Sequence, residues 1–285
     1  MTTFAPAGGV SSTAPPSTGV AEMFFRLTSV ELAILLFAAV FGATGIGALL
    51  GRRHRHRSDA MREPFAVLQG ALLGVVGLIL AFGLALAVGR YEARRAAVVD
   101  EANAIGTTYL RAQMLSEPQR GRSLALLTRY TDLSIQLSKA IPGSADAGRI
   151  LAAAALVERQ LWALAGRSVA AAPVDTVPRL YIESLNAMID SDGVRVAGLN
   201  NRVPNAVLLL EVVGAAAGLA LLAFYLAVLG RGLLTVLLAA GLVTMLLLVT
   251  FDLDRPTRGL ITVPATPLTS LRTSMALPPA AAATP

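Results

Sequence analysis

The sequence predicts an all-α, polytopic membrane protein with four transmembrane helices and an antiparallel helical stalk between the second and third spans. The chain has 285 residues, of which 55% are hydrophobic and only 15% are charged, whereas a soluble domain carries about 25% charge. Four apolar runs are each long enough to cross a bilayer, which takes about 20 residues. The polar segment between the second and third runs shows helical spacing and no strand-like alternation.

Residues 1–29 are rich in Pro, Ser, Thr, Gly and Ala and lack apolar periodicity, so we expect a disordered tail. A cleavable signal peptide is not indicated, because there is no basic n-region and the apolar run that follows is too long.

Segment 30–89 is expected to hold the first two spans, joined by the basic loop 52–64, which contains five arginines. The loop also carries His54 and His56. Two histidines without a carboxylate or thiolate partner make a poor metal site, so we expect no metal there. A solvated loop that touches anionic lipid is the better interpretation.

The second span begins at Phe65 and continues without a proline or turn cluster to about Leu115, which predicts one helix that leaves the bilayer and extends into water. At ~1.5 Å per residue it would be roughly 75 Å long, against a hydrocarbon core of about 30 Å. Small residues recur along one face of its apolar half, which favours packing against a neighbouring helix. A pore-lining face, or the general abundance of Gly and Ala, would explain them too. These residues are Gly70, Gly74, Gly77, Ala81, Ala85 and Gly89.

Residues 90–203 form the predicted stalk. Besides the continuation of the second span, three helices are expected at about 118–140, 145–169 and 176–202, separated by Pro- and Gly-containing breaks. Helices of this length with short connections are typical of an antiparallel bundle.

Residues 204–253 are predicted to form the third and fourth spans around a tight turn at 230–232, and 254–285 to form a partly ordered tail. Glu211 lies about two turns into the third span. A carboxylate facing lipid there would cost on the order of 3 kcal/mol. It therefore lies near the interface, makes a buried hydrogen bond, or belongs to an ion or proton path.

Charged residues gather where the second and fourth spans leave the membrane. If those spans are antiparallel neighbours, their charges lie at one height and favour interhelical ion pairs; an ion site at the membrane mouth is the alternative. The candidates are Arg90, Arg94, Arg95, Asp100, Glu101, Asp252, Asp254 and Arg255.

Four spans place both termini on the same side of the membrane as the stalk. The arginines of loop 52–64 make that loop cytoplasmic by the positive-inside rule, so the stalk and both termini are expected to be extracytoplasmic. Arginines that flank the spans on the stalk side, including Arg90, Arg94 and Arg255, count in the opposite direction.

Several functional classes are disfavoured. The chain has no cysteine, which excludes disulfides and thiolate metal sites. It shows no GxSxG, HExxH or phosphate-binding glycine loop, so we expect neither an enzyme nor a cofactor. Its arginines are dispersed and form no basic stripe with interleaved aromatics, so nucleic acid is not an expected partner.

Two blocks resemble a family of bacterial membrane proteins that carries a bestrophin-like domain. One is RYEARR at 90–95 with EANAIGT at 101–107, and the other is DLDRP at 252–256 with RGLI at 258–261. The resemblance covers roughly 30–275. It implies a multi-pass protein of the bacterial inner (cytoplasmic) membrane, similar to the oligomeric bestrophin anion channels, which have a helical domain between the second and third spans.

The sequence also departs from bestrophins. Their pore neck is lined by bulky apolar residues on the second span, where this chain offers Phe82 among Gly and Ala. Their acidic calcium clasp follows the fourth span, where Asp252 and Asp254 are followed here by Arg255. No pore or calcium residue is carried over. Bestrophins keep the helical domain in the cytoplasm, opposite to the orientation expected above.

Two functions follow as hypotheses. One is an oligomeric channel with the second span near the axis, whose partners are the bilayer, further copies of the chain and a small ion. The other is a membrane-anchored scaffold or sensor whose stalk binds a partner or ligand.

Overall fold

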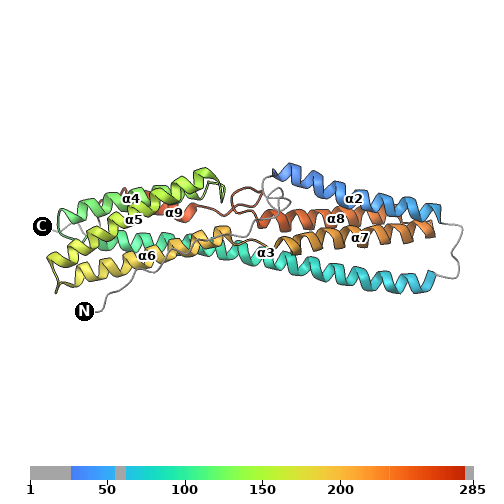
Figure 1. The fold of residues 1–285 in the computed structure, drawn as a ribbon, viewed down its shortest axis with the longest axis horizontal. Helices are drawn as coiled ribbons and strands as arrows, with labels where there is room; N and C mark the ends of the chain where they lie inside the picture. Colours follow the sequence, from blue (N-terminus) through green and yellow to red (C-terminus); the bar gives the residue numbers. More distant parts are fainter. Residues whose placement is uncertain (1–26, 55–61, 231, 280–285) are drawn as a thin grey trace, which may run out of the picture.

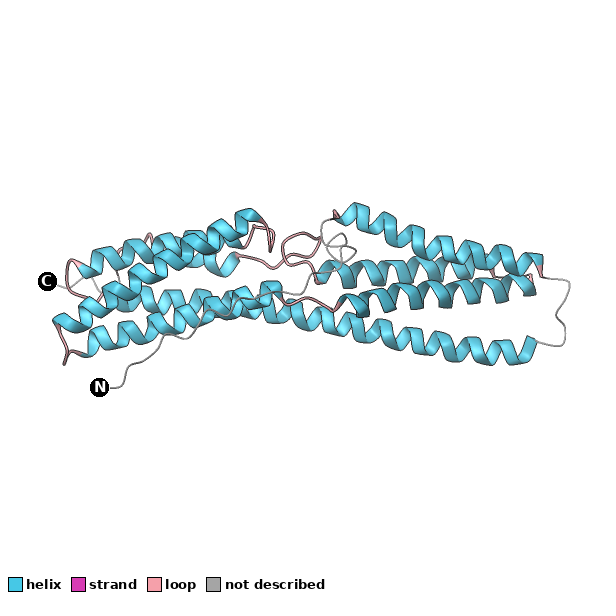
Figure 2. Ribbon diagram, viewed as in Figure 1, coloured by secondary structure: helices cyan, strands magenta, loops and turns pink. Residues whose placement is uncertain are grey.

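The computed structural model describes residues 27–54, 62–230 and 232–279. All regular structure in these ranges is helical, which confirms the predicted fold class, and four helices are long and apolar enough to span a membrane. Figures 1 and 2 show an elongated molecule with two helical bundles end to end, connected along their length by α3. The helices are α2 (Ser29–Arg53), α3 (Arg62–Ala112), α4 (Gln119–Leu137), α5 (Ala145–Ala171), α6 (Thr176–Asn200), α7 (Asn205–Leu229), α8 (Leu233–Leu253) and α9 (Thr266–Ser274). Most of the predicted N-terminal tail and part of the basic loop lie outside the described residues.

Helix α2 begins at a capping box. The Thr28 hydroxyl accepts from the Glu31 N–H at 3.2 Å, and the Glu31 carboxylate accepts from the Thr28 N–H at 2.7 Å, so two otherwise unpaired N–H groups of the first turn are satisfied. Farther along, Gly47 and Gly51 bring α2 against α7. A Cβ at either glycine would overlap the backbone of Ala220 or Phe224. This is the close small-residue packing expected between helices in lipid.

Helix α3 is a single element of 51 residues that serves both bundles. In its membrane half, Val76 and Leu80 are buried toward the other spans, and in its stalk half Val98 and Ile105 are buried in the stalk core. The predicted continuity from the second span into the stalk is therefore present.

The membrane bundle consists of α2, the first half of α3, α7 and α8. Its core is made of aliphatic side chains such as Leu36, Val40 and Leu247, all fully buried. Its outer surface is apolar too: Leu49, Leu242 and others are more than 60% exposed, as expected for a surface in contact with lipid. Gly230 and Gly232 close the α7–α8 turn with φ of 74° and 83°, a conformation that favours glycine.

The stalk consists of the second half of α3 with α4, α5 and α6, whose ends lie within a few residues of the predicted helices. Its core contains the fully buried side chains of Ile105, Leu127, Tyr130, Leu161 and Tyr181. Short helix connections bring sequence neighbours side by side, and α3 packs most closely with α6.

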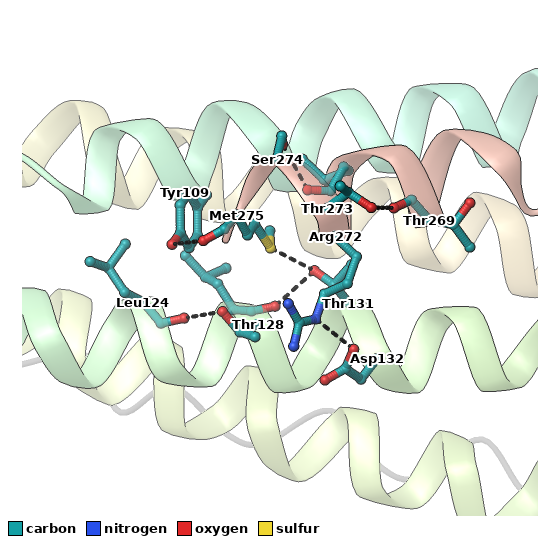
Figure 3. Close-up of polar contacts among 12 residues, drawn as sticks. Tyr109, Leu124, Thr128, Thr131, Asp132, Thr269, Arg272, Thr273, Ser274 and Met275 are labelled. Carbon is teal, nitrogen blue, oxygen red and sulfur yellow. Dashed lines mark hydrogen bonds and ion pairs between the residues drawn. The ribbon is translucent and has the colours of Figure 1, made fainter. Parts of the chain in front are cut away.

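The stalk includes one helix that the sequence analysis did not predict. Helix α9, from the segment expected to be a partly ordered tail, lies against α3 and α4 (Figure 3). Leu268 is fully buried, the Tyr109 hydroxyl donates to the Met275 carbonyl at 3.1 Å, and Arg272 pairs with Asp132 at 2.7 Å. The C-terminal segment thus returns from the membrane and completes the stalk core.

Candidate functional site

Polar groups are concentrated at the junction of the two bundles, where α3 passes straight through, α6 turns into α7, and α8 ends. Here Arg94 is buried, and it binds three segments at once. It donates to the carbonyls of Gly198 at 3.1 Å and Asn201 at 2.7 Å near the end of α6, and to the Leu253 carbonyl at 3.2 Å. Carbonyls in the last turn of a helix have no partner within the helix. Arg94 therefore supplies donors at the end of α8 and beside the α6–α7 turn.

Two aspartates connect the end of α8 to the rest of the junction. Asp254 pairs with Arg94 at 3.4 Å and accepts from the Val203 N–H at 3.1 Å. Burial raises the pKa of Asp254, while the Val203 N–H and Arg94 oppose that shift. Asp252 accepts from the Ser29 hydroxyl at 3.4 Å and from the Ile261 N–H at 2.8 Å. The two carboxylates thus hold α2, the α6–α7 turn and the segment after α8 at one level.

Arg255 lies beside these aspartates and differs from Arg94 in its hydrogen bonding. Its side chain is only 4% exposed, and Nε, Nη1 and Nη2 all lack a hydrogen-bond partner. Arg255 also lines a small pocket that is partly open to solvent, together with Arg202, Arg258 and Asp254. Burial lowers the pKa of Arg255, an effect opposed by the charge of Asp252.

The remaining predicted charges do not join this cluster. Arg90 is half-buried beside it, whereas Arg95 points outward to Glu92 at 3.7 Å and Asp100 is exposed. Glu101 lies in the stalk core and forms an ion pair with Arg195 of α6. The set that the sequence placed at one height is therefore divided between junction, surface and stalk interior.

The Glu101–Arg195 pair is part of a larger polar network between α3, α4 and α6. Glu101 also accepts from the Ser134 hydroxyl at 2.8 Å, while Arg195 donates to the Ser134 carbonyl at 2.9 Å and to the Ser138 hydroxyl at 2.7 Å. The sequence analysis did not single out Arg195. Its position seven residues after buried Met188 on the same helix face is the signal that indicates its burial.

Glu211 lies inside the membrane bundle, 1% exposed, with its carboxylate against Gly83 of α3. Neither carboxylate oxygen has a hydrogen-bond partner among the residues that the structure describes. The buried hydrogen bond considered from the sequence is therefore not what the structure shows, and a Cβ at position 83 would overlap the carboxylate.

The small-residue face of α3 is exposed along its length, and no helix of the described chain covers it. A Cβ at Gly70, Gly74, Gly77 or Gly89 would meet no atom within 4 Å. Instead α3 turns Val76 toward Gly214 and Gly218 of α7. The face consists of Gly70, Gly74, Gly77, Ala81, Ala85 and Gly89, and all six are exposed.

In the part of the chain that the structure describes, no group of three or more His, Asp or Glu side chains is arranged to hold a metal ion. The His54 ring bonds the Leu50 carbonyl at 2.9 Å through Nδ1, and His56 lies outside the described residues.

Comparison with curated proteins finds no match. Among solved structures, crystal structures of single-residue variants of a bacterial bestrophin homologue from Klebsiella pneumoniae are similar. One matches with a TM-score of 0.61 at 15% identity, covering 83% of this chain and 97% of the homologue, and another with a TM-score of 0.62 at 15% identity, covering 84% and 95%. At this identity the likeness shows the fold. The family model described as Bestrophin-like domain matches residues 33–268, most of the chain and both bundles. The chain therefore belongs to the Bestrophin-like family.

Proposed function

We propose that this protein is an oligomeric ion channel in which α3 of each copy lines the central axis. The observation that carries the proposal is the exposed small-residue face of α3, described above. Glycine and alanine at spacings of three and four residues permit close backbone approach between helices in lipid. Since none of the helices that the structure describes packs on this face, helices of further copies are its expected neighbours.

The family supports the same assignment, because bestrophins are oligomeric ion channels and this chain shares their fold over nearly the whole length of the bacterial homologue. The arrangement of four spans with a helical extension is common to both. The apolar outer surfaces of α2, α7 and α8 would then face lipid, while α3 faces the ion path.

The direct test is ion flux through purified full-length protein in liposomes. We expect flux above that of empty vesicles, reduced by about tenfold in Ala81→Phe because a large side chain would narrow the axis. The matched control is Leu242→Phe, at a side chain that is 71% exposed on α8, which should leave flux unchanged. Absence of flux at every voltage and pH would contradict the proposed channel function. Saturable binding of a partner by the full chain would then favour a scaffold or sensor.

Orientation follows from the charge of loop 52–64, and we propose a location in the bacterial inner membrane with the stalk and both termini extracytoplasmic. The chain has no native cysteine, so single cysteines can report topology. Ala145→Cys, at an exposed position on α5, should react with an impermeant maleimide on intact cells, whereas Ser58→Cys should not. The opposite labelling pattern would establish the cytoplasmic stalk of bestrophins.

A further inference from the structure

The buried guanidinium of Arg255 points to a binding site at the membrane–stalk junction. An arginine cannot shed its charge by deprotonation in a protein. Burying it without a partner costs several kcal/mol, and buried polar groups in native proteins almost always have a partner. Among the described residues, Arg255 has no hydrogen-bond partner for its three nitrogens although it is 4% exposed. The described part of the chain therefore leaves this charge to be paired by a bound group.

The nearby carboxylates are already engaged. Asp254 accepts from Val203 and Arg94, Asp252 accepts from Ser29 and Ile261, and Glu31 caps the start of α2. Their charges reach Arg255, since both Asp252 and Glu31 favour its protonated form. Their oxygens, however, accept hydrogen bonds from other donors.

The local charge balance favours an anion. Arg202 and Arg258 oppose the charge of Arg255 and line the same pocket, and Arg90 acts with Arg94 on the neighbouring Asp254. Of the five arginines at the junction only Arg94 and Arg255 are buried. Arg94 is bonded to three carbonyls and to Asp254, so Arg255 is the buried positive charge for which a bound anion would be favourable.

The chemistry of the pocket indicates which anion. A guanidinium presents a planar fork of donors that matches two oxygens of a phosphate group, and Thr257 on the pocket wall adds a hydroxyl. The pocket is small and partly open to solvent, which suits a single phosphate group better than a nucleotide.

We propose that the pocket formed by Arg202, Arg255 and Arg258 binds a phosphate-bearing anion, with the Arg255 guanidinium as its main ligand. The phosphate comes either from a lipid headgroup at the membrane mouth or from free phosphate. The bound phosphate neutralises the buried Arg255 and connects the end of α8 to the stalk residues Ile141 and Pro142 on the pocket wall. This assignment does not depend on ion conduction, because its test is a binding measurement.

The first experiment uses delipidated full-length protein in a neutral detergent and follows thermal unfolding by the fluorescence of its single tryptophan, Trp162. Sodium phosphate should raise Tm by about 5 °C over sodium chloride at equal ionic strength when the ligand is about 100-fold above Kd. Arg255→Gln should abolish the rise, and Arg255→Lys should retain part of it. The matched control is Arg95→Gln, at an outward-facing arginine of α3 whose side chain is 58% exposed, which should respond like the unmodified chain.

The second experiment separates the two sources of phosphate by native mass spectrometry of protein reconstituted with phosphatidylglycerol or with a phosphate-free glycolipid. Retention of phosphatidylglycerol that is lost in Arg255→Gln assigns the site to a lipid headgroup. A response to inorganic phosphate without lipid retention assigns it to free phosphate, and both results support the proposal.

Three results would overturn it: a phosphate response that survives in Arg255→Gln, an equal response to chloride, or no response and no lipid retention in the unmodified protein. Should Arg255→Gln dissociate the oligomer while phosphate has no effect on the unmodified protein, a carboxylate of a second copy pairs with Arg255 instead. If Arg255→Gln does not fold, the phosphate and chloride comparison in the unmodified protein and Arg255→Lys decides.

Discussion

The stalk and the membrane bundle each bury a carboxylate, but among the described residues only the carboxylate in the stalk has hydrogen-bond partners. In the stalk, Glu101 accepts from Ser134 and from Arg195, and Arg195 in turn donates to Ser134 and Ser138. In the membrane bundle, Glu211 is as deeply buried and has no hydrogen-bond partner. A desolvated charge of either kind is costly, and only the network in the stalk offsets that cost within one chain.

The same contrast extends to packing. The stalk encloses a core of tyrosine and aliphatic side chains and adds α9 from the C-terminal segment to complete it. In the described part of the chain, the membrane bundle leaves a whole face of α3 without a protein neighbour. The stalk therefore buries more of its α3 half within one chain, whereas the proposed oligomer would cover the exposed face of the membrane half.

The largest expected effect comes from breaking the network in the stalk. Arg195→Ala should lower the free energy of unfolding by about 3–5 kcal/mol, because it leaves Glu101 buried and unpaired. Thermal unfolding followed by circular dichroism would measure it. Arg149→Ala is the control, since its pair with Asp146 at 2.9 Å is largely exposed and should change stability little. Equal effects of the two variants would remove the contrast between a completed interior and a solvated surface.

The next largest effects are expected from substitutions at two glycines of the membrane bundle, Gly47 and Gly74. Gly47→Leu should destabilise the monomer by about 3 kcal/mol, because its side chain would collide with the backbone of α7. Gly74→Leu should leave monomer unfolding unchanged, since nothing lies near that position. It should instead shift the oligomer toward monomer in light scattering of detergent-solubilised protein. An unaltered oligomer would show that this face of α3 is not an interface.

A smaller effect is expected from pH. Burial, followed by the charge of Asp192, raises the pKa of Glu158 on α5 from 4.5 to about 7. The folded chain therefore binds a proton more tightly than the unfolded chain, so this contribution to stability is present below about pH 4.5 and is lost as pH rises through about 7. After allowance for partial exposure it amounts to about 1–2 kcal/mol. Glu158→Gln should remove this part of the slope in unfolding measurements from pH 5 to 8, and an unchanged slope would contradict it.

The smallest expected effect concerns Glu211. Glu211→Gln should leave stability unchanged or raise it by less than about 1 kcal/mol, because it replaces a buried carboxyl group that forms no hydrogen bond with a described residue. Glu101→Gln, its counterpart in the stalk, should destabilise. Flux in liposomes adds a second readout: conduction along the α3 axis should survive Glu211→Gln, whereas its loss would place the ion path between α3 and α7.

Much of the architecture could be predicted from local signals. Apolar length marks the four spans, and the Pro- and Gly-containing breaks mark the stalk helices, because both reflect short-range physical rules. Helix α9 could not be predicted in this way, because a short Thr- and Ser-rich segment carries little periodicity. It is held in place by contacts of Leu268 and Met275 with helices that are distant in the sequence.

The junction was predictable in part. Charges beside the second and fourth spans indicated interhelical pairing, and Arg94 with Asp254 is such a pair. Arg94 has hydrogen-bond partners because the carbonyls of Gly198, Asn201 and Leu253 lie next to it in space. The Arg255 side chain forms no hydrogen bond with these carbonyls. Sequence carries no such information, so Arg94 and Arg255 looked equivalent until their surroundings were known.

The uninterrupted course of α3 has a mechanical consequence. A helix of 51 residues rising ~1.5 Å per residue is about 76 Å long, and it behaves as a stiff rod where no proline or bulge weakens it. A tilt of about 5° around its midpoint would shift each tip by roughly 3 Å. A displacement at the far tip of the stalk would in this way move the membrane end of α3, with the arginine-rich junction as the pivot of the tilt.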